Sequence, residues 1–242
     1  MNGGIARVGV LIGAFADFLF PPLCYGCTAL LPPRFKILCP ACIAPLEALD
    51  AADPLYLLAR ERLCADGLVD DLVSLYRFEK GHELQMLLHQ LKYRGSAGIG
   101  RWFGEQVGNA VRSSAPPGRF DAIIPLPLHV ARKRERGYNQ SEQIARGMAK
   151  ALGLRVRPDV VRRVRYTSTQ TVLDSDERKA NMEGAFAVMP GRIEAIRDRG
   201  VLLVDDVITT GATLGACAMA LRRAGARQIV ACSVGVADRR NL

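Results

Sequence analysis

Two adjacent carboxylates, Asp205 and Asp206, stand between an apolar segment and a loop rich in threonine and glycine. The apolar segment, Val201–Val204, has the β-branched composition and the length of a buried parallel strand. The loop, Thr209–Thr213, precedes an apolar periodic stretch, Leu214–Leu221, that is typical of a helix. Backbone N–H groups at the start of a helix bind phosphate, and a glycine lets the main chain approach it closely. We therefore predict that this loop binds a phosphate.

The two carboxylates would repel a phosphate, so we expect them to face a different part of the ligand. Vicinal sugar hydroxyls donate well to a carboxylate pair, and such a pair also attracts a magnesium ion. The combination predicts a sugar 5-phosphate, with its phosphate in the loop and its hydroxyls on the acids. One alternative is an ordinary strand–turn–helix with solvated acids. Another is a Walker B strand, but the chain has no G-x-x-x-x-G-K-[ST] motif to accompany it.

Four cysteines near the start of the chain form two C-x2-C pairs, which are Cys24 with Cys27 and Cys39 with Cys42. Two such turns bring four thiolates into the tetrahedron that zinc prefers. A disulfide framework and a redox C-x-x-C are the alternatives. The metal-like spacing, in a chain expected to be cytosolic, favours zinc over both. Because protein ligands would fill all four positions, we expect the zinc ion to be structural.

Length and composition indicate a globular protein with one full α/β domain and a small appendage. The chain has 242 residues, of which 49% are hydrophobic and 24% charged, and its net charge is +9. This charge suits a polyanionic ligand, either a phosphorylated metabolite or a nucleic acid. Residues 1–20 are apolar, but Asp17 and the lack of a small-residue cleavage site argue against a signal peptide or a membrane span. We expect an amphipathic or buried helix there, and a cytoplasmic protein.

Strand-like and helix-like patterns alternate along the rest of the chain, which predicts an α/β fold whose parallel sheet is covered by helices on both faces. The region from Pro45 to about Asp70 has a weak pattern and is expected to be a connection. The expected strands cover 72–78, 120–124, 156–164, 186–188 and 228–236, and the expected helices cover 82–93, 99–111 and 140–152.

The stretch Val201–Thr213 resembles the signature that binds phosphoribosyl pyrophosphate (PRPP) in type I phosphoribosyltransferases, and it does so at every position. The resemblance implies that the two acids contact the 2′ and 3′ hydroxyls of the ribose and that the loop holds the 5′-phosphate. The acids are Asp205 and Asp206, and the loop residues are Thr209, Thr210, Gly211, Ala212 and Thr213. The implied metal at this site is Mg²⁺, bound together with PRPP.

A dense polar run, from Arg132 to Gln140, follows the expected strand over 120–124. Such a run is often only a solvated surface, but guanidinium groups match phosphate oxygens in two-point contacts. We therefore expect Arg134 and Arg136 to meet the pyrophosphate of PRPP. The polar stretch 166–181 is long for a loop. The resemblance implies a mobile loop that brings Arg178 to the same pyrophosphate; an idle surface loop is the alternative.

The order of these motifs is similar to that of the competence protein F (ComF) family. The match comprises the two C-x2-C pairs, Lys92-Tyr93, the Arg-Gly-Tyr-Asn-Gln stretch at 136–140, the PRPP motif, and Thr167, Gln170, Arg178 and Asn181 between them. It implies a type I phosphoribosyltransferase fold, a Rossmann-like parallel sheet, preceded by a zinc ribbon, in a protein associated with uptake or use of DNA. The domains would cover 1–20 (helix), 21–50 (ribbon) and 70–242. Single-stranded DNA and a DNA-uptake helicase are the implied macromolecular partners.

Three hypotheses of function follow from these features. In the first, the protein is a phosphoribosyltransferase in which Mg²⁺, Arg134, Arg136 and Arg178 neutralise the departing pyrophosphate. Asp205 and Asp206 would orient the ribose, and replacing both by asparagine should abolish PRPP binding with the fold intact. In the second, PRPP or a nucleotide is sensed without turnover. In the third, the ribbon and an arginine-rich stretch over 155–165 make a nucleic-acid adaptor.

Overall fold

The computed structural model describes residues 21–93, 95–164 and 184–238. It divides the chain into two compact units, Met1–Pro45 and Leu46–Leu242. The boundary falls inside the segment 21–50 that was expected to form the ribbon. The expected helix over 1–20, and the expected loop over 166–181 with Arg178, lie outside the described residues.

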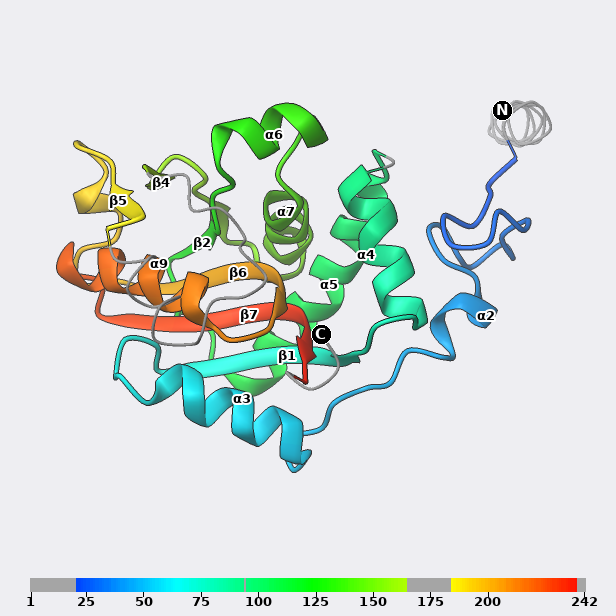
Figure 1. Ribbon diagram of the computed structural model, residues 1–242, viewed down its shortest axis with the longest axis horizontal. Helices are drawn as coiled ribbons and strands as arrows, with labels where there is room; N and C mark the ends of the chain where they lie inside the picture. Colours follow the sequence, from blue (N-terminus) through cyan, green and yellow to red (C-terminus); the bar gives the residue numbers. More distant parts are fainter. Residues whose placement is uncertain (1–20, 94, 165–183, 239–242) are drawn as a thin grey trace, which may run out of the picture. The chain divides into compact units, whose positions relative to one another are not determined.

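A five-stranded sheet in the order β1-β7-β6-β2-β3 forms the larger unit, and each neighbouring pair of strands is parallel (Figure 1). The bounds are Asp71–Phe78 for β1, Ala122–Pro125 for β2, Arg155–Val156 for β3, Gly200–Ile208 for β6 and Gln228–Ala237 for β7. Strands β6 and β7 at the centre are almost wholly buried and rich in Val, Ile, Leu and Ala. The expected α/β fold with a parallel sheet is confirmed.

Helices cover both faces of this sheet, as the sequence predicts. Helices α3 (Pro54–Cys64) and α9 (Ala212–Arg223) share one buried core with Val201 and Leu203 of β6. Neighbouring residues of a strand point to opposite faces, so Leu202 and Val204 serve the other face. There α5 (Ala97–Ser114) and α7 (Gln140–Leu152) pack on the sheet and on each other, and α4 (Glu83–Tyr93) packs on α5.

Two glycines allow α5 and α7 to pack closely. A Cβ atom on Gly104 would lie 1.9 Å from the carbonyl oxygen of Ile144, and one on Gly147 would lie 2.1 Å from that of Arg101. Both distances are far below van der Waals contact and involve main-chain atoms. Helix α7 therefore cannot keep its position if a side chain is added at either glycine.

We expect Gly147→Ala to lower the free energy of unfolding by about 3 kcal/mol, because two helix backbones must separate. Urea denaturation followed by circular dichroism measures the change. Gly215→Ala is the matched control: it lies inside α9 with nothing within 4 Å of its Cβ position, and the helix propensity of alanine should stabilise it by up to about 1 kcal/mol. Equal urea midpoints for Gly147→Ala and the unaltered chain would contradict this packing.

The prediction of a single strand over 156–164 is wrong, because the segment divides into two short strands of different sheets. Strand β3 pairs with β2 in the main sheet, whereas β4 (Val161–Arg163) pairs antiparallel with β5 (Phe186–Val188). Pro158 lies between β3 and β4 and has no N–H to donate to a ladder. The N–H of Val160 turns back to the carbonyl of Arg157. A short 3₁₀ helix, Ile193–Ala195, follows β5.

The expected connection from Pro45 to about Asp70 is also wrong, since it contains α3. The side chain of Asp53 accepts the N–H of Leu55 at 2.8 Å, and Pro54 occupies the first helical turn. Both are start signals that the sequence carries. The apolar residues of α3 are spread around the helix, so they show no helical periodicity in the sequence. Leu57 and Leu58 are exposed, while Leu63 is buried. Within the described residues, no helix combines the length and apolar character needed to cross a bilayer.

Candidate functional site

Asp205 and Asp206 lie inside β6, which corrects the expectation that they follow the strand. Strand β6 continues to Ile208 because β7 keeps pairing with it, for example Asp205 with Ser233. Strand β2, on the other side, ends at Pro125 opposite Val204. The acids therefore stand just beyond the end of β2, at the carboxyl edge of the sheet, which is where ligands bind in open α/β folds.

The loop after β6 leads directly into α9, as expected, although the helix begins at Ala212 rather than at Leu214. Gly211 has φ +76°, a conformation that favours glycine, and a Cβ atom there would lie 2.9 Å from Leu63 Cδ1. The N–H of Ala212 donates to Thr210 Oγ1 at 3.3 Å. In the described part of the chain, the N–H of Thr213 has no acceptor. The first turn of α9 thus keeps a donor available for an anion.

Each acid has its own partner, and the two partners come from different helices. Lys92, in the last turn of α4, forms an ion pair through Nζ with Asp206 Oδ2. Ser141, at the start of α7, donates from Oγ to Asp205 Oδ1 at 3.1 Å, and the N–H of Asp206 donates to the same oxygen at 2.8 Å. Asp206 is buried and Asp205 is partly buried. The pair is therefore held in place before any ligand arrives.

The electrostatics of the two acids differ in direction. Burial, and then the charge of Asp206, raises the pKa of Asp205 well above its ordinary value. Burial also raises the pKa of Asp206, but the Lys92 ammonium and its hydrogen bond lower it more, so the net pKa falls below the ordinary value. Asp206 is therefore the anion of the pair, and Asp205 is the carboxyl group that holds a proton more readily.

Arg136 lies at the end of α6 (Val130–Arg136), a short helix that contains the polar run and ends at Gly137. Its guanidinium carbon is 5.3 Å from the centre of the Tyr93 ring, and Nη1 donates to Gln140 Oε1 at 3.1 Å. Its Nε is buried and finds no acceptor among the described residues. Because Tyr93 follows Lys92, Arg136 is brought next to the end of α4 from which Lys92 reaches the acids.

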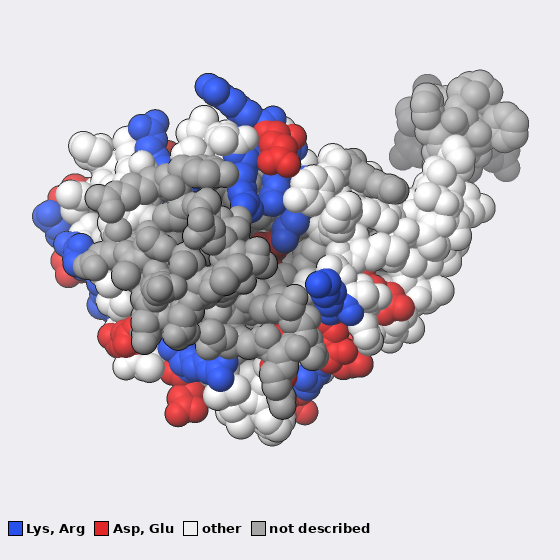
Figure 2. Space-filling view, in the orientation of Figure 1, with Lys and Arg blue, Asp and Glu red and all other residues white. Residues whose placement is uncertain are grey.

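Arg134 is exposed on α6, with no ion-pair partner among the described residues. Figure 2 shows Lys and Arg side chains gathered over this helix, at the top of the view. The structure thus brings Arg136 to the end of α4, and it leaves Arg134 on the outer surface.

Lys92 and Ser141 were missed as site residues. In the sequence, Lys92 is marked only by its place in the Lys92-Tyr93 pair at the end of an expected helix. Ser141 follows a stretch that does carry a signal: Asn139 caps α7 by accepting the N–H of Ser141 at 3.0 Å, and it donates to the carbonyl of Leu126 at 2.9 Å. This cap ties the start of α7 to the loop after β2, and so positions Ser141 beside Asp205.

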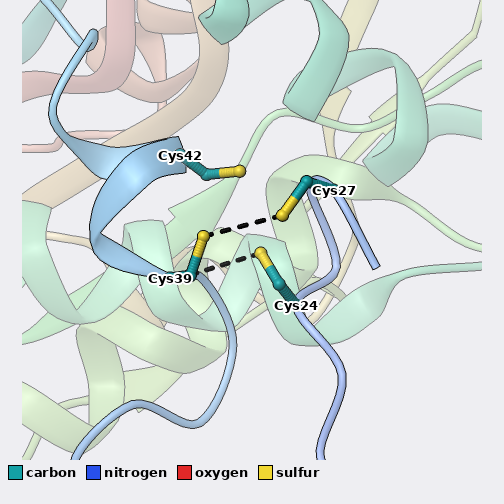
Figure 3. A group of neighbouring side chains, drawn as sticks. All are labelled: Cys24, Cys27, Cys39 and Cys42. Carbon is teal, nitrogen blue, oxygen red and sulfur yellow. Dashed lines mark hydrogen bonds between the residues drawn. The ribbon is translucent and has the colours of Figure 1, made fainter. Parts of the chain in front are cut away.

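The four cysteines of the first unit converge. The sulfur atoms of Cys24, Cys27, Cys39 and Cys42 all lie within 4.8 Å of one another, and Figure 3 shows them directed toward a common point. Cys39 precedes a single helical turn, α2 (Pro40–Ile43). The Sγ of Cys24 accepts the N–H of Cys39 at 3.2 Å and that of Gly26 at 3.4 Å. Four sulfurs at these distances could bind a metal such as zinc.

Two of these thiols differ in acidity in the absence of a metal ion. Burial raises the pKa of Cys24, but backbone N–H groups directed at its sulfur lower it to about 6. Burial, followed by hydrogen bonds with the neighbouring cysteines, raises the pKa of Cys42. Donors that stabilise a thiolate are what a site for a cation needs, because the metal binds the deprotonated sulfur.

Comparison with known proteins finds a matching family model and several relatives. Residues 124–241 match the family described as "Phosphoribosyl transferase domain". Competence protein F of Haemophilus influenzae is 34% identical over 149 residues, covering 60% of this chain and 65% of that protein. DNA utilization protein YhgH of Escherichia coli K12 is 32% identical over 151 residues, covering 60% and 64%. Competence protein ComFC of Bacillus subtilis is 25% identical over 213 residues, covering 87% and 83%. The match thus spans slightly less than two thirds of the length of the first two relatives.

Proposed function

The chain belongs to the ComF family and carries a phosphoribosyltransferase domain, and from this premise we propose that its larger unit binds PRPP. The observation that carries the proposal is the acid pair of β6, which lies one loop away from the open first turn of α9. The loop Thr209–Thr213 would hold the 5′-phosphate. Asp205 and Asp206 would accept hydrogen bonds from the ribose hydroxyls, which are neutral donors that a fixed carboxylate pair binds well.

The pyrophosphate would lie on the side of α6. Arg136 supports this assignment, because its buried Nε lacks an acceptor and its guanidinium is held against Tyr93. We assign Arg134 and Arg178 to the same group, as residues that would approach it from α6 and from beyond the described residues. The acid pair and the pyrophosphate oxygens fit a Mg²⁺ ion, which would supply charge neutralisation.

If the bound PRPP also reacts, the protein would be a phosphoribosyltransferase. An acceptor nucleophile forms a bond to C1 of the ribose, the bond from C1 to the pyrophosphate oxygen breaks, and pyrophosphate leaves with the electron pair. Arg136 would stabilise the leaving group, and the acids would orient the sugar. The words "competence" and "DNA utilization" in the names of the relatives support a role in the uptake or use of DNA. Single-stranded DNA and a DNA-uptake helicase would then be its partners.

In the first unit, the four cysteines would hold a structural Zn²⁺ ion. Four sulfurs leave no open position for chemistry. Free thiols that bind a metal persist in a reducing compartment, which supports a cytoplasmic location.

A second candidate function is a nucleic-acid adaptor, and the exposed basic surface of α6 favours it. Lys133 and Arg134 are exposed there, and the net charge of the chain is +9. Such a surface would bind the phosphates of single-stranded DNA without reading sequence. The affinity for single-stranded DNA, measured at increasing salt concentration, tests this second function. A steep loss of affinity supports the adaptor, and no binding at low salt excludes it.

Calorimetric titration with PRPP and Mg²⁺, with pyrophosphate release followed in parallel, tests the main proposal. Binding with release in the presence of an acceptor indicates an enzyme, and binding without release indicates a sensor. A chain that shows no heat of binding at any PRPP concentration would overturn the proposal.

Gly211→Asp sharpens this test, because it adds a carboxylate where the phosphate would lie. We expect PRPP affinity to fall at least 100-fold by charge repulsion, with some loss of stability because the φ of +76° and the nearby Leu63 side chain strain any side chain here. Gly211→Asn is the matched control, because it adds nearly the same bulk and the same strain at this position without the charge. Equal PRPP affinities for the two variants would refute a phosphate site in the loop.

A further inference from the structure

Lys92 has a contact that the proposed roles of the acids do not explain. Its ammonium meets Asp206 Oδ2, and the exposed fractions of the two side chains are 27% and 8%. In residues 21–93, 95–164 and 184–238, no other Lys, Arg or His forms an ion pair with either acid. Asp205, by contrast, accepts from the neutral hydroxyl of Ser141 and from a backbone N–H. Among the described residues, the acid pair thus has a single cationic partner, Lys92, and that partner is on its buried member, Asp206.

That partner stands where a divalent cation would have to bind. A Mg²⁺ or Mn²⁺ ion needs carboxylate oxygens within direct contact, and a Lys ammonium on the same oxygen repels it. The two cations therefore compete for Asp206. The lowered pKa of Asp206 agrees with a carboxylate that is already neutralised by its neighbour.

The Lys92 ammonium is also able to move away from Asp206. Lys92 is partly exposed, and its flexible four-carbon stem lets the charge move by several ångströms. Tyr93 is the next residue, and the guanidinium of Arg136 lies over its ring. A phosphate group bound by Arg136 would therefore come close to the end of α4. Oxygens of that group would attract the Lys92 ammonium away from Asp206.

We propose that Lys92 is a positioning residue for the acid pair: its ammonium holds Asp206 and keeps a free divalent cation out until a ligand carrying phosphate groups draws it away. Asp206 then becomes available to the ligand and its metal. The order of events is that metal alone binds poorly, and metal together with the phosphorylated ligand binds well. This inference rests on the proposed function for the identity of its ligand. The ion pair between Lys92 and Asp206 does not depend on that function.

Titration with Mn²⁺ alone, followed by electron paramagnetic resonance of the free ion, tests the first half. We expect Lys92→Met to bind Mn²⁺ at least tenfold more tightly than the unaltered chain, and Lys92→Arg to bind as weakly as the unaltered chain. Lys150→Met is the matched control, because Lys150 pairs with Glu105 at 2.8 Å on the surface of the same unit. It removes the same charge and should leave Mn²⁺ affinity unchanged. Equal Mn²⁺ affinities for Lys92→Met and the unaltered chain would overturn the inference.

Calorimetry with PRPP and Mg²⁺ tests the second half. Lys92→Met should bind this ligand at least tenfold more weakly, although it binds Mn²⁺ more tightly, and Lys92→Arg should restore most of the loss. A purely structural defect would weaken both. Should Lys92→Met not fold, Lys92→Gln retains a donor toward Asp206 and carries the same expectations. If the unaltered chain binds no PRPP, the proposed function fails, while the Mn²⁺ titration still decides the role of Lys92.

Discussion

A chain in which Cys24, Cys27, Cys39 and Cys42 are all serine is expected to purify without zinc and to lose the fold of its first unit. In residues 21–45, the described part of this unit, Leu31 and Leu38 are the only buried apolar side chains apart from the cysteines. Such a small core cannot offset the entropy of ordering the chain. A structural zinc ion supplies about 10–16 kcal/mol to such a site, which makes metal binding and folding one event.

Metal analysis and limited proteolysis check this expectation on the whole chain. The unaltered protein should hold one zinc ion per chain and resist cleavage between residues 21 and 45. A strong chelator should expose that segment while the sheet of the larger unit remains protected. Cys64→Ser is the control, because Cys64 ends α3 outside the cluster, and it should keep its zinc. A metal-free protein whose first unit still resists proteases would disprove the metal's role in folding.

The sheet could be predicted from the sequence because its strands carry their own signal. A fully buried parallel strand is a largely continuous apolar run, and Val201–Val204 of β6 and most of β7 are such runs. The sequence does not show how far neighbouring strands continue beside each other. The end of β6 was misjudged for this reason: the polar Asp205 suggests a strand end, while pairing with Ser233 of β7 continues past it.

The same limit explains the other errors in the fold. A run with apolar and basic residues over 156–164 suggests one strand, but Pro158 divides it between two sheets. Helix α3 has no single apolar face, so periodicity could not reveal it, although Asp53 and Pro54 mark its start. Asp53 and Pro54 are therefore a stronger signal for α3 than the pattern of its hydrophobic residues.

The candidate site was predictable only where it is contiguous in sequence. The acids and the loop up to Thr213 form one stretch, and a helix start with a positive-φ glycine follows from the residue types. Lys92 and Ser141 reach the acids from helices far away along the chain, and their contacts arise from the packing of α4 and α7. These contacts also require a revision: the expectation that asparagine at both acids leaves the fold intact took no account of Lys92.

The two acids should respond in different ways to the same substitution. Asp206→Asn leaves the Lys92 ammonium without its counter-charge in a largely buried place, and we expect the free energy of unfolding to fall by about 3 kcal/mol. Asp205→Asn should change it by less than about 1 kcal/mol near neutral pH. The amide resembles the protonated carboxyl group that the raised pKa of Asp205 favours, and it can still accept from Ser141.

The pH dependence of stability separates these two effects. The pKa of Asp205 is raised on folding, so its contribution is present below the unfolded pKa and is lost as pH rises through the folded value. Asp205→Asn should remove this loss on the alkaline side. The pKa of Asp206 is lowered, so its contribution is present above the unfolded pKa and is lost as pH falls through the folded value. Asp206→Asn should remove that loss on the acid side.

Urea denaturation at a series of pH values, from acid to alkaline, measures how the stability of each variant depends on pH. The double variant that combines Lys92→Met with Asp206→Asn is the decisive one. If the cost of Asp206→Asn comes from an orphaned ammonium, removing the ammonium as well should recover most of the lost stability. A double variant whose losses simply add would mean that Lys92 and Asp206 do not interact in solution. Asp205→Asn combined with Lys92→Met should show no such recovery, because Ser141, rather than Lys92, is the side chain that holds Asp205.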